Sequence, residues 1–220
     1  ADGGRRGRHC KGARPGLTVD QYRSLLINSA ADSVITSDGS APLIQRQGAG
    51  LLDVSAALNS PLAASPVSIS LGTGGTVLST STTLALTNLS GVDDTFTLAA
   101  APRYGTLTPA FESATIDLAA GASATLNVAW TGNDLAIGPQ EGYITATSTA
   151  SGRVVRVPYW YDATDSAPAN IVVLESLTSA YSYYFSQYPA VVFRVTDAAG
   201  AVVTSTTPTV SVVSGSASYV

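Results

Sequence analysis

Residues 124–130 read ATLNVAW, and apolar side chains alternate with smaller or polar ones along this stretch. A period of two is the pattern of a strand that buries one face. The stretch therefore predicts a β-strand that directs Trp130 into a core. The turn-forming pairs Ala120-Gly121 and Gly132-Asn133 flank it, which indicates a short strand between two reversals of the chain.

The same period recurs on both sides of this stretch. Strands spaced about ten residues apart and separated by turn signals are typical of a β-sandwich. Phe96 and Ile144 join Trp130 as expected core residues, and each large buried side chain contributes about 2 kcal/mol. The predicted strands cover residues 67–71, 84–86, 95–98, 114–118, 124–130, 142–149 and 153–160.

Residues 15–60 have a helical pattern instead. Thr18 and Gln21 have the spacing of a capping box, and apolar residues then recur at helical intervals to about residue 30. A second short helix is predicted from Asp53 to Leu58. Gly48 and Gly50 precede it and allow the backbone to approach closely.

Residues 162–168 read as a linker, and 169–220 predict part of a second β-domain with strands at 171–177, 191–196 and 209–213. Four tyrosines gather between the first two of these strands. They can form an aromatic platform for a carbohydrate or peptide ligand, or they can lie on strand faces with their hydroxyls in water. Both interpretations stay open for Tyr181, Tyr183, Tyr184 and Tyr188.

Composition favours an exported β-rich protein. The chain is 45% hydrophobic and only 12% charged, and Ser, Thr, Gly, Ala and Val dominate it. No apolar run approaches the roughly 18 residues of a membrane helix, so no membrane span is expected. We expect a secreted or cell-surface protein of a bacterium. Because the sequence contains no methionine, we also expect it to be part of a longer protein.

Residues 1–14 form a basic arm, which we expect to be disordered. It contains no aromatic residue to stack on bases and no amphipathic period, so no nucleic-acid partner is expected. His9 beside Cys10 would be half a metal site, but no second Cys or His completes it. The sequence therefore predicts no metal site and no cofactor.

The origin of this arm has two explanations. Alanine codons of a GC-rich gene give Gly and Arg when they are read in a shifted frame, and residues 1–13 are rich in both. The arm is then a frame-shifted reading of an alanine-rich helix or follows a mispredicted gene start. The alternative is an unrelated natural tail.

The order of two motifs resembles the end of subtilisin-like serine protease domains. Pro15-Gly16-Leu17-Thr18 opens the first helix, and QGAGLLDV at 47–54 leads into the second. The resemblance covers residues 15–59 and implies that 15–60 are the closing helices of a catalytic α/β domain. Such helices would have lost the parallel sheet that they cover in the family and would not fold independently.

The remainder resembles modules that follow such proteases. Residues 64–163 are similar to a fibronectin-III-like accessory domain, and 169–220 to the first half of an immunoglobulin-like domain. The implied fold class is mainly β. It consists of a fibronectin-III/Ig-like β-sandwich, preceded by a short α-helical remnant of a subtilase domain and followed by a partial Ig-like domain.

The family cleaves peptides with a Ser nucleophile, a His base and an orienting Asp. The motif around its nucleophile would fall at or before residue 1, and His9 is not in the family's His-Gly-Thr context. No catalytic, cofactor-binding or metal-binding residue is therefore assigned, and the chain should be inactive alone.

Two functions follow from these patterns. The resemblance implies the C-terminal part of a secreted serine endopeptidase, whose protein or peptide substrate would bind through the missing catalytic domain. The β-domain would then position the substrate or attach the enzyme. The alternative is a non-catalytic extracellular adhesion or wall-associated protein built from Ig-like modules.

Overall fold

The computed structural model describes residues 11–176, 191–209 and 211. The chain divides into two compact units, residues 1–163 and 164–220. His9, Cys10 and most of the basic arm lie outside the described residues, as does the tyrosine cluster at 181–188.

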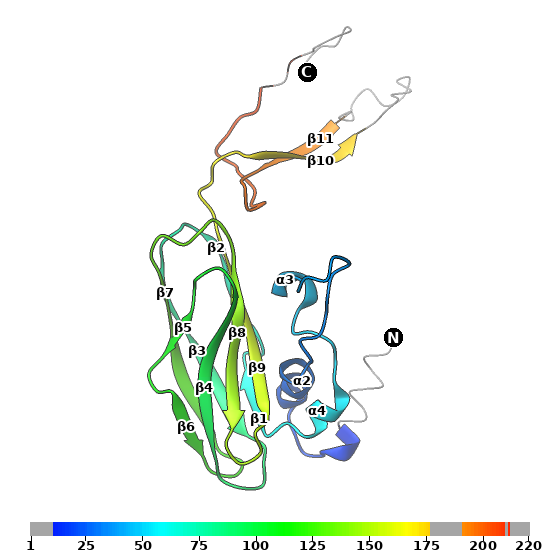
Figure 1. The fold of residues 1–220 in the computed structure, drawn as a ribbon, viewed down its shortest axis with the longest axis vertical. Coiled ribbons are helices and arrows are strands. Elements are labelled where there is room, and N and C mark those ends of the chain that lie inside the picture. Colours follow the sequence, from blue (N-terminus) through cyan, green and yellow to red (C-terminus); the bar gives the residue numbers. More distant parts are fainter. Residues whose placement is uncertain (1–10, 177–190, 210, 212–220) are drawn as a thin grey trace. The chain divides into compact units, whose positions relative to one another are not determined.

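The first unit is an Ig-like β-sandwich, as predicted (Figure 1). One sheet has four strands in the order β1 (Leu62–Ser65), β3 (Leu78–Asn88), β7 (Ser123–Gly132) and β5 (Pro109–Phe111). The other has five, in the order β2 (Ile69–Gly74), β9 (Val154–Ala163), β8 (Gly138–Ser148), β4 (Asp94–Tyr104) and β6 (Thr115–Leu118). Neighbouring strands are antiparallel, except that β2 and β9 run parallel.

The core between the sheets contains the three aromatic and aliphatic residues expected there. Trp130, Phe96 and Ile144 are all buried. The Trp130 ring lies 4.9 Å from that of Tyr159, and its indole N–H donates to the Thr82 hydroxyl at 2.8 Å. A buried aromatic residue whose polar atom has a partner contributes its full apolar area without a desolvation penalty.

The seven strands predicted between residues 67 and 160 are all present, most with longer bounds, and β1 and β5 are additional. The predicted strand at 209–213 falls largely outside the described residues and stays a prediction. The alternation that reveals a half-buried strand is missing from β1, because Leu62, Ala63 and Ala64 are all buried. Strand β5 spans three residues, which is too short to show any period.

The N-terminal segment contributes helices α2, α3 and α4, which lie along one side of the sandwich (Figure 1). Helix α2 (Val19–Asn28) begins at the predicted capping box, in which Thr18 and Gln21 exchange hydrogen bonds. Helix α4 (Val54–Leu58) begins at Asp53, whose carboxylate accepts from the Ala56 amide at 2.9 Å. Helix α3 (Ile44–Gln47) was not predicted.

These helices are not a remnant that has lost its sheet, and that interpretation was wrong. Leu25 of α2 and Ala57 of α4 are completely buried and pack together. Ser24, on the same face of α2, accepts a hydrogen bond from the Ala64 amide of β1 at 2.7 Å. The helical segment and the sandwich therefore belong to one compact unit.

Asn28 makes the second polar connection between α2 and the sandwich. Its side-chain amide donates to the carbonyls of Val67 and Arg156, at 2.7 and 2.8 Å. Its carbonyl oxygen accepts from the Ser24 hydroxyl at 2.8 Å. The buried face of α2 thus carries polar groups that match backbone groups of this sandwich, whereas a face selected to cover a parallel sheet would be apolar.

Arg14, which the sequence placed in the arm, is also bound to this unit. Its guanidinium donates to the carbonyls of Ser60 and Leu89, both at 2.7 Å. The Tyr22 hydroxyl donates to the Arg14 carbonyl at 2.5 Å. Three hydrogen bonds therefore fix the chain just before α2.

The second unit contains the antiparallel pair β10 (Asn170–Ser176) and β11 (Val191–Thr196). Asp197 organises the turn after β11: its carboxylate accepts from the Thr164 hydroxyl and from the Ala201 amide. The Thr164 hydrogen bond is the main cause that lowers the pKa of Asp197. The completion of an Ig-like domain by residues up to 220 stays a prediction.

Candidate functional site

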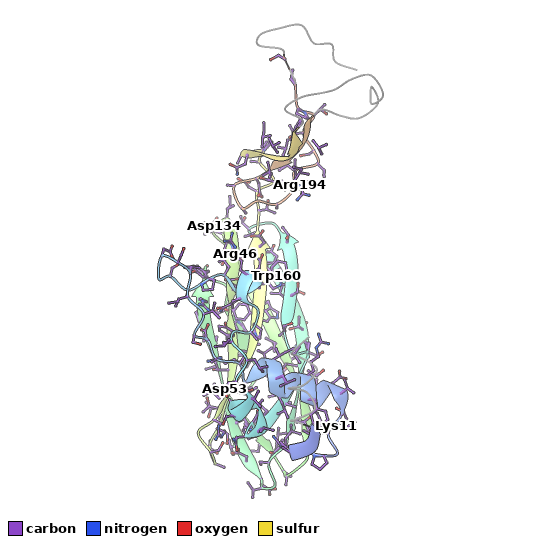
Figure 2. All side chains as sticks on the ribbon, turned by 90° about the vertical axis from the view of Figure 1, so that its right-hand side faces the viewer. Lys11, Arg46, Asp53, Asp134, Trp160 and Arg194 are labelled. Atoms are coloured by element: carbon purple, nitrogen blue, oxygen red, sulfur yellow. The ribbon has the colours of Figure 1, made fainter. Side chains whose placement is uncertain are left out.

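The outward face of the five-stranded sheet brings together acidic, aromatic and apolar side chains. Glu141 and Tyr143 on β8 lie opposite Trp160 and Pro158 on β9. Because side chains alternate along a strand, these four residues share the outward face, while Ile144 of β8 points into the core. Figure 2 looks onto this face and labels Trp160.

Residues 31–51, here called the strap, cover part of this face and include α3. The ends of the strap meet in a two-hydrogen-bond bridge, in which Ala31 and Leu51 exchange N–H···O bonds of 2.7 and 2.8 Å. Gly50 makes the bridge possible, because it has φ 116° and a Cβ there would lie 2.3 Å from the Ala31 carbonyl oxygen. The strap is thus a loop with a closed neck.

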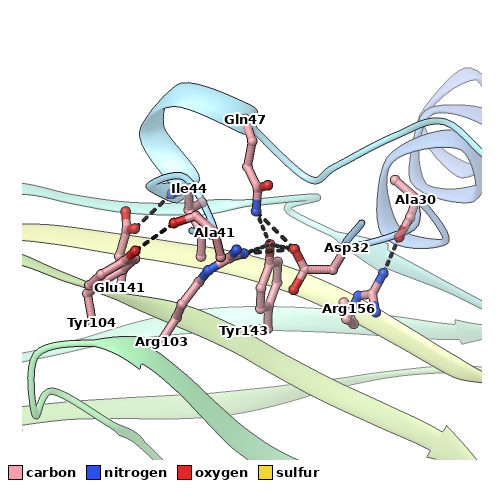
Figure 3. Close-up of polar contacts among 10 residues, drawn as sticks. All are labelled: Ala30, Asp32, Ala41, Ile44, Gln47, Arg103, Tyr104, Glu141, Tyr143 and Arg156. Atoms are coloured by element: carbon pink, nitrogen blue, oxygen red, sulfur yellow. Dashed lines mark hydrogen bonds and ion pairs between the residues drawn. The ribbon is translucent and has the colours of Figure 1, made fainter. Parts of the chain in front are cut away.

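A polar cluster connects the strap to the sheet (Figure 3). Asp32 forms an ion pair of 2.7 Å with Arg103 of β4. Gln47 donates from its side-chain amide to the Tyr143 hydroxyl at 2.9 Å and to the Asp32 carboxylate at 3.1 Å. The strap supplies Asp32 and Gln47, and the sheet supplies Arg103 and Tyr143.

The cluster changes the acidity of its members. Partial burial opposes ionisation of Asp32, but hydrogen bonds from Arg103 and Gln47 outweigh it and lower the pKa of this carboxyl. Burial, together with the nearby Asp32 charge, raises the pKa of the Tyr143 phenol. Asp32 therefore serves as a stable anion, and Tyr143 as a neutral hydroxyl.

Glu141 lies under α3 and is completely buried. One carboxylate oxygen accepts from the Ile44 amide at 2.7 Å (Figure 3). Burial raises the pKa of Glu141, and hydrogen bonds from the Ile44 and Gln45 amides and the charge of Arg103 offset this only in part. Glu141 is therefore a buried carboxyl group that is bonded to the backbone of α3, and not an exposed acid.

Three buried polar atoms at this interface have no hydrogen-bond partner among the described residues: Glu141 Oε2, Gln47 Oε1 and Arg156 Nε. A buried polar atom without a partner costs about 1–3 kcal/mol. Arg156 is held in other ways, since its guanidinium donates to the Ala30 carbonyl and lies 5.7 Å from the Tyr143 ring centroid. The interface is polar and incompletely satisfied.

An apolar cavity of about 440 Å³ lies where the strap meets α2 and β9. Its volume is within the range of about 300–1,000 Å³ that is usual for small-molecule sites. Trp160, which is half-buried, forms one wall with Pro158. The remaining walls come from α2, the strap and nearby loops: Leu26, Ile27, Ala30, Ile44, Gln45, Gly48, Ala49, Gly50, Leu52 and Ser68.

A second hollow is acidic, but its carboxylates have structural partners. Asp94 accepts from the Ser148 hydroxyl and the Ala150 amide, and these bonds lower its pKa although burial opposes them. Asp93 accepts from the Ala120 amide, and Asp117 from the Thr95 hydroxyl. Within the part of the chain that the structure describes, no three His, Cys, Asp or Glu residues are placed to hold a metal ion.

The sequence did not point to this face. Glu141 immediately precedes the predicted strand 142–149, and Trp160 ends the predicted strand 153–160. The available signal was a carboxylate at the start of a strand that is otherwise buried, which is unusual unless the charge has a partner.

Among the described residues, no helix is both long and apolar enough to cross a bilayer.

No family model and no curated protein sequence matches the chain. Similar solved structures include a FixG-related protein from Vibrio parahaemolyticus, with 12% identity, a TM-score of 0.36, and coverage of 48% of this chain and 98% of that one. The E. coli chaperone DraB has 9% identity, a TM-score of 0.38, and coverage of 48% and 56%. The secreted serine protease VesC from Vibrio cholerae has 19% identity, a TM-score of 0.36, and coverage of 50% and 28%.

These comparisons correct the subtilase interpretation. No protease family model matches, and the likeness to VesC is distant and spans 28% of that protein. The structure agrees, because α2 and α4 pack on an antiparallel sandwich rather than on a parallel sheet. The assignment to a subtilisin-like serine protease was therefore wrong, whereas the predicted Ig-like β-sandwich is confirmed.

Proposed function

We propose that the chain is a non-catalytic, extracytoplasmic module of an adhesion or wall-associated protein, and that the cavity beside Trp160 is its ligand contact. The observation that supports this most directly is how the charged groups of the candidate site are used. Asp32, Arg103 and Glu141 bind one another, tyrosine or backbone amides, and so attach the strap to the sheet. The concave surface left beside them is mainly apolar.

A mainly apolar concavity with a few polar groups at its border is the usual form of a binding site. Trp160 suits this role because an indole presents a large rigid contact area at low entropic cost. The composition is that of an exported β-rich protein, which supports a place outside the cytoplasm. The second unit, with its own β-pair, supports a protein of tandem β-modules.

Cosedimentation of the full chain with isolated bacterial cell walls, and in parallel with intact bacterial cells, tests the proposal. We expect saturable binding to at least one of them. Trp160→Ala should weaken it about tenfold, equivalent to about 1.4 kcal/mol. Thr83→Ala is the matched control, because Thr83 is exposed on the four-stranded sheet.

Three outcomes would overturn the proposal. They are failure to sediment with either material, equal loss of binding in both variants, and peptide cleavage by the purified chain. Circular dichroism of Trp160→Ala ensures that lost binding is not lost folding.

A further inference from the structure

We infer that the strap, residues 31–51, opens as a unit from the five-stranded sheet while the sandwich stays folded. The inference goes beyond the proposed function, because it concerns a motion of the chain itself and holds for any ligand.

The neck of the strap is built to remain closed. Its two hydrogen bonds join Ala31 and Leu51, and α2, which ends just before Ala31, is fixed to the sandwich through Ser24 and Asn28. At the other end of the neck, Asp53 caps α4. The strap can therefore leave the sheet without disturbing the helices on either side.

The contacts beyond the neck are chiefly polar. The strap is attached through the Asp32–Arg103 ion pair, the Gln47–Tyr143 hydrogen bond and the bond from the Ile44 amide to Glu141. The Tyr104 hydroxyl adds a bond of 2.6 Å to the Ala41 carbonyl. Water replaces such contacts well on opening, so each contributes little net stability.

The apolar contribution is small by comparison. Ile44 and Pro42 are the buried apolar side chains of the strap, whereas Ile35 is 71% exposed. Opening also exposes to water the unpartnered oxygens of Glu141 and Gln47. A segment with few buried apolar contacts and an incompletely satisfied polar interface belongs to the low-stability part of a fold.

Opening changes what the outward face presents. Glu141, Tyr143 and Arg103 become accessible together. The cavity also loses the wall that Ile44, Gln45 and Ala49 form. The opening through which a ligand reaches Trp160 then becomes wider. The strap thus controls access to the cavity.

Amide hydrogen exchange of the full chain tests the inference, with the Ile44 amide as reporter because it is bound to Glu141. We expect Ile44 to exchange at least about 100-fold faster than the amides of the β8–β9 ladder, since its opening is sub-global. Arg103→Gln and Tyr104→Phe should each accelerate Ile44 further and leave the ladder unchanged. Arg153→Gln, at an exposed arginine of the β8–β9 turn, is the matched control and should change neither.

Exchange of Ile44 at the ladder rate would overturn the inference, because the strap would then open only with the whole sandwich. Acceleration of the ladder in Arg103→Gln would overturn it as well, and so would the absence of any effect on Ile44 in both β4 variants, Arg103→Gln and Tyr104→Phe. These readouts involve no cell wall, so their failure is distinct from a failure of the proposed binding function.

Discussion

The two faces of the five-stranded sheet make two different kinds of interface. The inner face packs Phe96, Ile144 and Tyr159 against Trp130 of the opposite sheet, in an apolar cluster. The outer face meets the strap through carboxylates, arginine and tyrosine. The same strands supply both faces through alternate residues. We therefore expect the inner interface to determine whether the chain folds, and the strap interface to determine what the folded sheet exposes.

The largest test of this contrast is Trp130→Ala. It removes the most voluminous completely buried side chain and should cost about 3–5 kcal/mol, much of the 5–15 kcal/mol typical of a domain. Urea unfolding followed by circular dichroism measures the loss. Trp160→Ala, on the outer face, should cost far less; equal losses would remove the distinction between the faces.

The next effect is expected at Asn28, where α2 is bound to the sandwich. Asn28→Ala leaves two backbone carbonyls and the Ser24 hydroxyl without their partner, so unfolding free energy should fall by about 1–3 kcal/mol. Asn59→Ala is the control, because the Asn59 side chain is exposed and bonds only locally. A stability equal to wild type would show that α2 docks through apolar contacts alone.

Glu141→Gln sharpens the comparison through pH. The folded-state pKa of Glu141 is raised, so its contribution to stability is fully present below its ordinary pKa of about 4.3 and is lost as pH rises through the raised value. Arg103 and Tyr159 are the charged and titratable groups that interact with it. The variant keeps an acceptor for Ile44 and should gain stability relative to wild type as pH rises over that interval. The unfolding free energies of the variant and of wild type are compared at several pH values. If their difference did not change with pH, Glu141 would not be a buried carboxyl group with a raised pKa.

The smallest effect is expected for Asp32→Asn. The pKa of Asp32 is lowered, so its contribution is present above the ordinary Asp pKa and is lost as pH falls through the lowered value. A pair near the surface is worth at most about 1 kcal/mol. At neutral pH the variant should therefore leave the melting temperature almost unchanged while accelerating exchange at Ile44. A large loss of global stability would make the strap part of the folding core.

The sequence predicted the inner interface well, because apolar and polar side chains alternate within each short strand. The alternation around Trp130 and Phe96 reflects one buried face, and both side chains are buried as expected. The capping box at Thr18 was equally readable, since its partners are three residues apart. Strand β1 was not predicted, because its first three residues are all buried and so show no alternation of apolar and polar side chains.

The outer interface could not be read in the same way. The Ile44–Glu141 bond joins residues 97 positions apart, and the Arg103–Asp32 bond joins residues 71 apart. No local pattern encodes such pairs. The apolar positions of α2 indicated the face on which Leu25 is buried, although Val19, the first of them, is 82% exposed. The resemblance suggested the wrong surface for that face to cover. Ser24 and Asn28 on that face were the overlooked sign, because polar residues inside an apolar stripe need specific backbone partners.

The parallel pairing of β2 with β9 has a mechanical consequence. These strands lie near the two ends of the sandwich sequence and pair from Ile69–Tyr159 to Gly74–Ala163, with one shift of register between Ser70 and Thr73. Tension that pulls the start of β2 and the end of β9 apart loads their hydrogen bonds in shear, all at once, whereas an antiparallel terminal pair would unzip one bond at a time. Forced unfolding is governed by the height of the barrier rather than by equilibrium stability. Between the start of β2 and the end of β9, the sandwich therefore has the geometry that resists tension in shear.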